Sequence, residues 1–376
     1  MFGKEADVGI FSNRRRKKSA LSSTNPLLRW FGPGATSIGI LYGVYMILSG
    51  GWSFSSLDSL LGTDPEAKFR GETITLGDQT ERAPDRIRIA TFNIEHFADK
   101  KSSTRVNEVG VDVLGTIAKI VSTFDLVAIQ ELQGADGAAL QRLIGLLNES
   151  GGSYAATMSD PIGDDENDYK ESYAFVWDRT RISFIPGSAY VVLDNGKKMD
   201  REPMVATFQT VVPKDSPRPP FRFTMINVHT TPSNVDPERR DSEINVLADV
   251  FQRVRQYEFE QSAEDDFIML GDFNASTKNL GQLATIDGLT SLAEDIQTNV
   301  SRQKTNDHIM IDRNVTGEYA GRKGVIDFIA DLKLTREQAD TISDHLPLWA
   351  EFEFYEREQV TAPRSVASGP GTRMIQ

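Results

Sequence analysis

The chain is organised around the stretch Ile268-Met269-Leu270-Gly271-Asp272-Phe273-Asn274-Ala275, where an apolar run ends in two polar side chains. The run predicts a buried β-strand. Residues two apart on an extended segment face the same side, so Asp272 and Asn274 are expected to point together into one cleft. Gly271 allows the backbone to turn sharply or to come close to a ligand. The stretch therefore predicts a functional site at the carboxyl end of a core strand.

Similar polar residues stand beside four other apolar runs, namely Asn93, Glu131, His229 and the pair Asp344-His345. Loops at strand ends are the places where a rigid sheet positions functional groups. Taken singly, such an Asn or Glu is commonly a turn residue, and such a His is commonly structural. Their recurrence at strand ends favours one shared site.

The residue types in this set indicate metal chemistry. Carboxylate and amide oxygens suit Mg²⁺ or Mn²⁺, which also take water and substrate oxygens. Two of the four histidines lie in the set, and imidazole can exchange protons near neutral pH or stabilise a phosphate. The set therefore predicts metal-assisted hydrolysis of a phosphate ester.

The composition sets outer limits on these predictions. The chain has 376 residues, 39% of them hydrophobic and 20 of them Phe, which allows one large domain or two ordinary ones with a sizeable core. Cysteine is absent, so disulfides and thiolate metal sites are excluded. The net charge of −13 is either a solubility feature or a field that repels an anionic substrate. In the second case a local cation has to meet the substrate.

The N-terminal region has the pattern of a membrane anchor. The basic run Arg14 to Lys18 precedes an uncharged stretch from Trp30 to Leu57, with Trp30 and Trp52 near its two ends. A bilayer span needs about 20 predominantly apolar residues, and interfacial aromatics flank such spans. Basic residues before the span predict a cytoplasmic N-terminus, with the catalytic domain on the opposite side. A cleaved signal peptide and a buried hairpin are the alternatives.

The remaining organisation follows from composition shifts along the chain. Gly and Pro without a sustained period predict a linker, and a tail with few large apolar residues predicts disorder. The predicted parts are a basic N-terminal segment (1–29), a transmembrane anchor (30–57), a linker (58–85), one compact domain (86–354) and a disordered tail (355–376).

Short strand-like runs alternate with helical patterns inside the compact domain, which predicts α/β layers with sheets covered by helices. The strand-like runs are 87–92, 125–130, 173–177, 204–212, 221–229, 266–270, 325–330 and 346–353. The helical patterns are at 104–123, 136–149 and 239–256.

Eight pieces of the sequence together resemble the endonuclease/exonuclease/phosphatase superfamily, and within it the pancreatic-type deoxyribonucleases most closely. They occur in the family's order: TFNIEHF at 91–97, IQEL at 129–132, YKESYAF at 169–175, DREPMV at 200–205, INVHTTPS at 226–233, MLGDFNAS at 269–276, TNDHIMID at 305–312 and ISDHLPLW at 342–349. The resemblance implies an α/β (α+β) fold of four layers, an αββα sandwich of two packed β-sheets with outer helices and a cleft at one end. The single transmembrane helix is expected to precede it.

The same resemblance implies roles in binding the metal and activating water. Glu131 would be the principal ligand of Mg²⁺ or Mn²⁺, with Asn93 and Asp344 nearby. Asp272 would orient or deprotonate the attacking water, helped by Asn274.

Two imidazoles complete the implied machinery. His345 would contact the scissile phosphate while Asp307 holds it, and His229 would be the second imidazole, held by Glu171. Such pairing orients a ring and favours its charged form.

The resemblance also bears on the substrate. Tyr169 and Arg201 match positions that touch nucleic-acid backbone in the nuclease branch. Glu95 and Gln133 stand where the pancreatic-type enzymes have arginines that approach DNA phosphates, and Asn306 stands where an aromatic is usual. The disulfides of that branch are missing. These departures leave the chemistry in place but count against simple binding of duplex DNA.

The leading hypothesis is a membrane-anchored, Mg²⁺-dependent phosphodiesterase with nucleic acid as substrate, an endonuclease-like hydrolase. The alternative enzyme is a phosphatase or phospholipase-type phosphodiesterase acting on lipid headgroups or small phosphate esters. A non-catalytic binding module is the third possibility, although every expected catalytic position is retained. No protein partner is inferred.

Overall fold

The computed structural model describes residues 72–73, 76, 82–103, 106–163, 169–194 and 196–357. The predicted basic segment and membrane anchor lie outside these residues, as do most of the predicted linker and the tail from residue 358 onward. Those expectations therefore stay predictions. Within the described residues, no helix has both the length and the apolar character that a membrane crossing requires.

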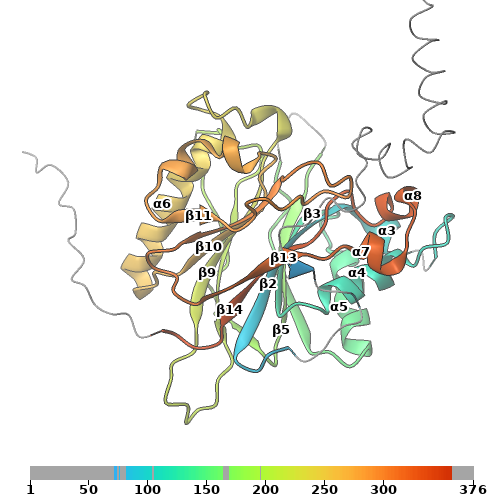
Figure 1. Cartoon of the computed structure of the whole chain (residues 1–376), viewed down its shortest axis with the longest axis horizontal. Helices are drawn as coiled ribbons and strands as arrows, with labels where there is room; N and C mark the ends of the chain where they lie inside the picture. Colours follow the sequence, from blue (N-terminus) through green and yellow to red (C-terminus); the bar gives the residue numbers. More distant parts are fainter. Residues whose placement is uncertain are drawn as a thin grey trace, which may run out of the picture. The chain divides into compact units, whose positions relative to one another are not determined.

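Two β-sheets form the centre of the described chain (Figure 1). Sheet 1 has the order β1 (Glu72–Thr73), β13 (Tyr319–Val325), β14 (Leu348–Glu353), β2 (Arg86–Phe97), β3 (Leu126–Leu132), β5 (Ser172–Asp178) and β4 (Tyr154–Met158). Sheet 2 has the order β11 (Leu289–Ser291), β12 (Asp307–Asp312), β10 (Phe267–Asp272), β9 (Arg222–His229), β8 (Met204–Thr210) and β6 (Ile182–Phe184), with β7 (Tyr190–Val191) beside β8. Both sheets mix parallel and antiparallel pairs.

Alternation along the central strand β10 explains why the sheets pack in layers. Successive side chains of a strand point to opposite faces. Ile268 and Leu270 belong to the larger core cluster, which includes residues of both sheets, whereas Phe267 and Met269 pack in a second cluster with helix α6 (Glu243–Ser262). The two faces of sheet 2 therefore bury different partners, sheet 1 on one side and α6 on the other.

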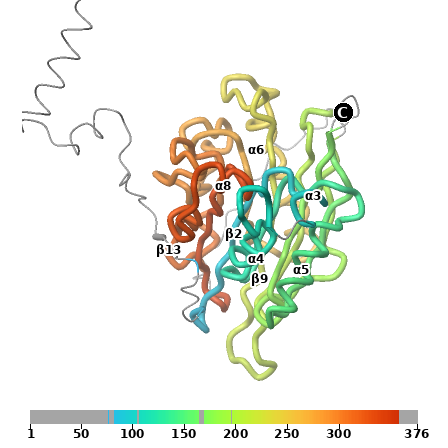
Figure 2. The backbone as a smooth tube through the Cα atoms, turned by 90° about the vertical axis from the view of Figure 1, so that its right-hand side faces the viewer, coloured from blue at the N-terminus to red at the C-terminus, as the bar shows by residue number. Residues whose placement is uncertain are grey.

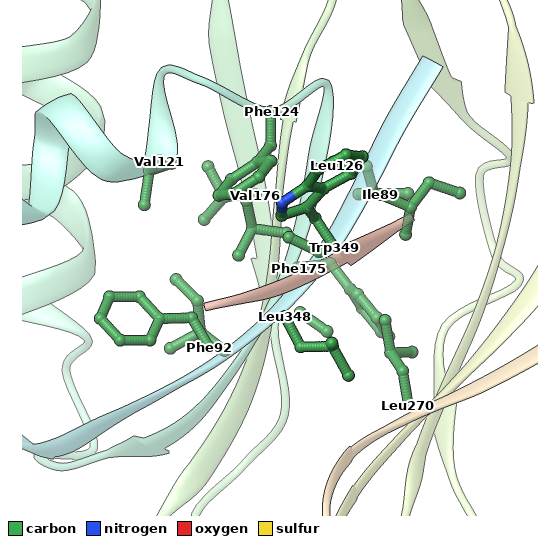
Figure 3. Close-up of a cluster of buried hydrophobic side chains, with 14 of the residues drawn as sticks. Ile89, Phe92, Val121, Phe124, Leu126, Phe175, Val176, Leu270, Leu348 and Trp349 are labelled. Atoms are coloured by element: carbon green, nitrogen blue, oxygen red, sulfur yellow. The ribbon is translucent and has the colours of Figure 1, made fainter. Parts of the chain in front are cut away.

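Helices also accompany sheet 1. These are α3 (Asp99–Ser103), α4 (Val113–Val121) and α5 (Ala138–Glu149), which lie beside β3 and away from α6 in Figure 1. Val121 of α4 gathers with Phe124, Leu126 and Trp349 in the buried cluster of Figure 3. Two packed mixed sheets with helices are therefore present, as the sequence predicted.

Some predicted boundaries were wrong. The helical pattern predicted over 104–123 begins only at Val113, because Asp112 caps the helix by accepting the Gly115 backbone N–H. The strand predicted over 325–330 is divided between the end of β13 and the short helix α7 (Phe328–Leu332), which Asp327 caps. Part of the predicted linker joins the fold, because β1 pairs with β13 in parallel register. Strand β12 was not predicted, although its residues were recognised as a motif.

Gly271 provides a direct test of this architecture. A Cβ there would lie 1.9 Å from the Val228 carbonyl oxygen on the neighbouring strand, and the φ angle of Gly271 is 143°. We expect Gly271→Ala to lower the free energy of unfolding by about 4 kcal/mol or more, because backbone atoms of β9 cannot move aside cheaply. Thermal unfolding followed by circular dichroism measures the loss.

The matched control is Gly145→Ala in helix α5, where no atom lies within 4 Å of the added Cβ. That variant should be as stable as the wild type or more stable by up to about 1 kcal/mol, because Ala favours a helix over Gly. Equal melting temperatures for the two variants would contradict the close approach of β9 and β10.

Candidate active site

Three neighbouring strands of sheet 2 place polar residues side by side in the register of the sheet. In the register of these strands, Asp272 at the end of β10 stands opposite His229 of β9 and opposite Asp307 of β12. Sheet 1 supplies Asn93 from β2 and Glu131 from β3. The Asn93 Nδ2 lies 3.0 Å from Glu131 Oε1 and 3.2 Å from Asp272 Oδ2, so the two sheets meet at this site.

Irregular backbone places the residues from sheet 1. The pairing of β2 with β3 shifts between Asn93 and Phe97, and that of β3 with β5 shifts between Ile129 and Leu132. Glu131 has a φ of 60°, a left-handed conformation that costs a non-glycine residue about 1 kcal/mol or more. Irregularities of this kind re-aim a side chain that a regular strand would send elsewhere. Glu131 Oε2 accepts the backbone N–H of His96 at 2.9 Å.

Two buried carboxylate–imidazole pairs face Asp272. The Nδ1 of His229 lies 2.6 Å from Glu171 Oε1, and the Nδ1 of His345 lies 2.7 Å from Asp307 Oδ2. The other ring nitrogens both approach the carboxylate of Asp272, since the Nε2 atoms of His229 and His345 lie 3.7 and 3.5 Å from its Oδ2. Each ring is thus held on one side and presents its second nitrogen to the site.

These contacts set the charge of the site. Burial opposes protonation, but Glu171 raises the pKa of His229 above its ordinary value. Burial likewise opposes protonation of His345, whereas Asp307 and Asp272 raise the pKa of His345 well above its usual range. Burial, with a contribution from Asp307, raises the pKa of Asp272 despite the two imidazoles. The site therefore holds two readily protonated rings beside a carboxylate that accepts a proton more easily than usual.

The oxygen donors around Glu131 fit a hard divalent cation. Asn93 Oδ1 is buried without a hydrogen-bond partner, beside the Glu131 carboxylate. Burial alone would raise the pKa of Glu131, but His229 and hydrogen bonds from His96 and Asn93 hold it below its usual value. Amide and carboxylate oxygens are the ligands that Mg²⁺ and Mn²⁺ prefer. The donor set thus suits the predicted metal.

A second group in the same site has metal-ligand spacing. Asp272, Asp307 and His345 each offer a ligand atom, and these atoms lie within 4.8 Å of one another. The predicted ligand Asp344 is more peripheral, because its side chain is 53% exposed and its Oδ1 lies 3.7 Å from the His345 Nε2. The roles of these residues as ligands stay predictions.

The structure also places the other predicted site residues. The backbone N–H of Asn274 donates to Asp272 Oδ1 at 2.9 Å, and its side chain donates to the Thr230 carbonyl at 2.8 Å. The hydroxyl of Tyr169, a residue 39% exposed, lies 3.4 Å from Glu131 Oε2. Both residues are therefore adjacent to the carboxylates of the site.

Arg201 has a different setting from the one expected of a substrate contact. Its side chain is buried, lies 3.6 Å from Glu171 Oε1, and donates to the His229 carbonyl at 3.1 Å and to Thr231 Oγ1 at 3.1 Å. These contacts brace the Glu171–His229 pair. Its predicted role in substrate binding stays a prediction.

Sequence reasoning missed His96, whose side chain is 60% exposed. Its Nδ1 lies 3.0 Å from Gln133 Nε2 and 3.7 Å from Glu131 Oε2. Its ring meets the Tyr169 ring edge-on at 6.1 Å between centroids. Its place between Glu95 and Phe97, close after Asn93, was the available signal. His308, by contrast, is buried, and its ring nitrogens lie 2.7 Å from Ser291 Oγ and 2.8 Å from the Ala275 carbonyl oxygen.

A pocket of about 640 Å³ lies next to Glu131, beside His96 and Gln133. It is lined by His96 and Gln133, by Lys100 and Lys101, and by apolar side chains that include Val106, Val109 and Val113. The Lys101 ammonium donates to the carbonyl oxygens of Glu95 and Ile342. Glu108 adds an acidic side chain to the wall. A group bound beside Glu131 could therefore extend into a pocket with charged and apolar walls.

Comparisons with known proteins find relatives by sequence. No protein-family model matches the chain. Human deoxyribonuclease-1-like 1 is 27% identical over 73% of this chain and 87% of its own length, and rat deoxyribonuclease-1 is 29% identical over 70% of this chain and 90% of its own length. The resemblance to pancreatic-type deoxyribonucleases is thereby confirmed.

Solved structures with a similar backbone have more distant sequences. The human Nocturnin catalytic domain is 17% identical, with a TM-score of 0.48 over 72% of this chain and 94% of its own. A mannosyl-6-phosphatase of Bacteroides thetaiotaomicron is 17% identical, with a TM-score of 0.48 over 70% of this chain and 98% of its own.

Proposed function

We propose that this deoxyribonuclease-like chain is a metal-dependent phosphodiester hydrolase that cleaves nucleic acid as an endonuclease. One observation carries the proposal: two buried carboxylate–imidazole pairs present their free nitrogens to Asp272, next to the oxygen donors of Asn93 and Glu131. The deoxyribonucleases to which the chain is similar support the choice of nucleic acid.

Each group has a task in this proposal. Glu131, Asn93 and Asp344 would hold Mg²⁺ or Mn²⁺, and the bound ion would stabilise negative charge on the phosphate as a Lewis acid. Asp272 would take a proton from the attacking water, a role that suits a carboxylate whose pKa burial has raised.

The two rings act on the phosphate itself. Protonated His229 and His345 would donate their Nε2–H groups to phosphate oxygens, where charge grows in the transition state. As the bond from phosphorus to the leaving ester oxygen breaks, one of these rings would pass its proton to that oxygen. Glu171 and Asp307 keep both rings oriented through Nδ1. Because these partners are buried and already in place, little reorganisation is needed during the reaction.

The exposed side chains beside Glu131 support nucleic acid as the substrate. His96 and Tyr169 offer partly exposed rings at the site, and such rings can stack on bases without sequence preference. Lys100 lines the neighbouring pocket and is exposed, so a flanking phosphate could approach it there. Glu95 disfavours close contact with a second phosphate, so we propose single-stranded or locally opened nucleic acid as the preferred form.

The apolar wall of the same pocket favours one rival. Val106, which is 54% exposed, and Val109 would suit an acyl or other apolar group. A phosphatase or phospholipase-type phosphodiesterase acting on lipid headgroups or small phosphate esters is therefore the second candidate. The predicted N-terminal anchor would hold such an enzyme near its substrate.

A substrate panel distinguishes the two candidates. The full chain is incubated with Mg²⁺ and, separately, with supercoiled plasmid, single-stranded DNA, phosphorylated lipid headgroups and small phosphate monoesters. We expect nicking of the plasmid and faster cutting of the single strand, with no release of headgroup or inorganic phosphate. Headgroup or phosphate release without strand cleavage would overturn the nuclease proposal and support the rival.

A further inference from the structure

A second group of acidic residues lies at the other end of the sheets. Asp266 immediately precedes β10, Glu318 immediately precedes β13, and Glu356 follows β14. These three residues each offer a carboxylate oxygen, and the three oxygens lie within 4.8 Å of one another. Strand β10 separates Asp266 from Asp272 by six residues, which corresponds to about 20 Å along an extended strand. The group is therefore separate from the active site.

The long connection between β8 and β9, residues 211–221, lies at the same end of the sheets as this acidic group. It projects below the sheets in Figure 1 and again in the turned view of Figure 2. Strand β9 begins directly after it at Arg222, whose backbone N–H donates to Glu356 Oε1 at 2.9 Å. Glu318 and Glu356 thus come from the strands of sheet 1, and Asp266 comes from sheet 2.

Two carboxylate oxygens of this group are buried and unpaired. Asp266 and Glu318 are each only 3% exposed, and neither Asp266 Oδ1 nor Glu318 Oε2 has a hydrogen-bond partner in the described part of the chain. The hydroxyl of Thr316 is buried next to Asp266 and interacts with its carboxyl group, which lowers the pKa of Asp266 against the effect of burial. Buried acceptors of this kind are costly unless something satisfies them.

The nearby arginines form their ion pairs with other carboxylates. The Arg222 guanidinium pairs with Glu264 at 3.1 Å, and the Arg357 guanidinium pairs with Glu353. Among the residues that the structure describes, no Lys or Arg side chain forms an ion pair with Asp266, Glu318 or Glu356. Burial and the carboxylates of Glu318 and Glu356 raise the pKa of Asp266 to about 9, which reflects the cost of placing these charges together.

We propose that Asp266, Glu318 and Glu356 bind a divalent, oxygen-preferring cation, Ca²⁺ or Mg²⁺, which joins the two sheets at the end opposite the active site. Carboxylates and hydroxyl oxygens are the ligands that such ions take. The ion offsets the repulsion among the three carboxylates and pairs the two free oxygens. Because its ligands belong to both sheets, it stabilises the packing of one sheet on the other.

The test separates this site from the active site by using the full chain with Glu131→Gln, which removes the predicted principal ligand there. After chelation and dialysis, the melting temperature is measured without metal and with millimolar Ca²⁺ or Mg²⁺. We expect at least one of the two ions to raise it by about 5 °C or more at concentrations well above the dissociation constant. Equilibrium dialysis should show one bound ion per chain.

Adding Asp266→Asn should abolish both the thermal shift and the bound ion. In the absence of metal the same variant should melt no lower than its parent, because asparagine has the shape of the carboxyl group that it replaces. Glu149→Gln, an exposed residue at the end of α5, is the matched control and should leave the metal response unchanged. A merely structural Asp266 would instead make the metal-free variant less stable.

Two results would overturn the proposal. One is the absence of binding and of stabilisation by either ion in the Glu131→Gln chain. The other is an undiminished response after Asp266→Asn. If Asp266→Asn does not fold, Glu356→Gln takes its place, since Glu356 is less buried. None of these measurements depends on hydrolysis, so failure of the nuclease proposal would leave them interpretable.

Discussion

Replacing Asp272 with asparagine is expected to lower the rate of phosphodiester hydrolysis by about 10⁴-fold, the upper range for loss of a general base. Asparagine has nearly the same shape, and it can still accept the backbone N–H of Asn274 that Asp272 Oδ1 accepts at 2.9 Å. It cannot accept a proton from water near neutral pH. Initial rates on plasmid and single-stranded DNA measure the loss, with circular dichroism to check the fold.

Asp340→Asn is the matched control for that substitution. Asp340 ends helix α8 (Arg336–Asp340), where it pairs with Arg336 on the surface. Exposed pairs of this kind contribute little to stability, so both activity and melting temperature should stay near those of the wild type. A loss of less than tenfold in Asp272→Asn would show that Asp272 is not the base and would remove it from the proposed mechanism.

Asp307→Asn is expected to change the pH dependence as well as the rate. Burial disfavours the charged His345 ring, and Asp307 is the main group that raises the pKa of His345 well above its ordinary value. Without that carboxylate, the pKa of His345 falls and the ring loses its proton at lower pH. The alkaline limb of kcat/KM should therefore move to lower pH, and the rate at pH 8 should fall by about 10² to 10³-fold.

The raised pKa of His345 also makes the stability of the fold depend on pH. A histidine whose pKa is higher in the folded than in the unfolded chain stabilises the fold at pH values below the unfolded pKa. That contribution is lost as the pH rises through the folded pKa. Asp307→Asn should thus reduce stability more at pH 6 than at pH 9. An unchanged alkaline limb together with a lower rate would mean that Asp307 only packs against the ring.

Much of the site was predictable because it follows strand periodicity. The apolar run before Gly271 indicated a core strand, and the structure places Asp272 at its end beside His229 of the parallel neighbour. Asp272 and Asn274 were expected to share a face of one extended segment, but β10 ends at Asp272 and Asn274 has a φ of 47°. Asn274 contacts the Asp272 carboxylate through its backbone N–H, while its side chain donates to the Thr230 carbonyl. The motif pieces also indicated the two carboxylate–imidazole pairs, which are present at 2.6 and 2.7 Å.

Other features were not predictable from local pattern. The left-handed φ of Glu131 depends on how β3 pairs with two neighbouring strands. The burial of Arg201 and the exposure of His96 depend on which residues from distant segments surround them. The acidic group of Asp266, Glu318 and Glu356 forms because three strands start or end at the same place. The spacing of these residues in the sequence does not predict that they lie close together.

Hydrolysis at this site is proposed to require a cation held by Glu131 and Asn93. The most direct measurement is the nicking of supercoiled plasmid by the full chain after EDTA treatment, with Mg²⁺ added back in steps, for the wild type and for Glu131→Gln. We expect no nicking without metal, full recovery in the wild type, and recovery in Glu131→Gln only at much higher Mg²⁺ or not at all. Nicking that persists in EDTA, or equal Mg²⁺ dependence of the two proteins, would show that hydrolysis does not require this cation.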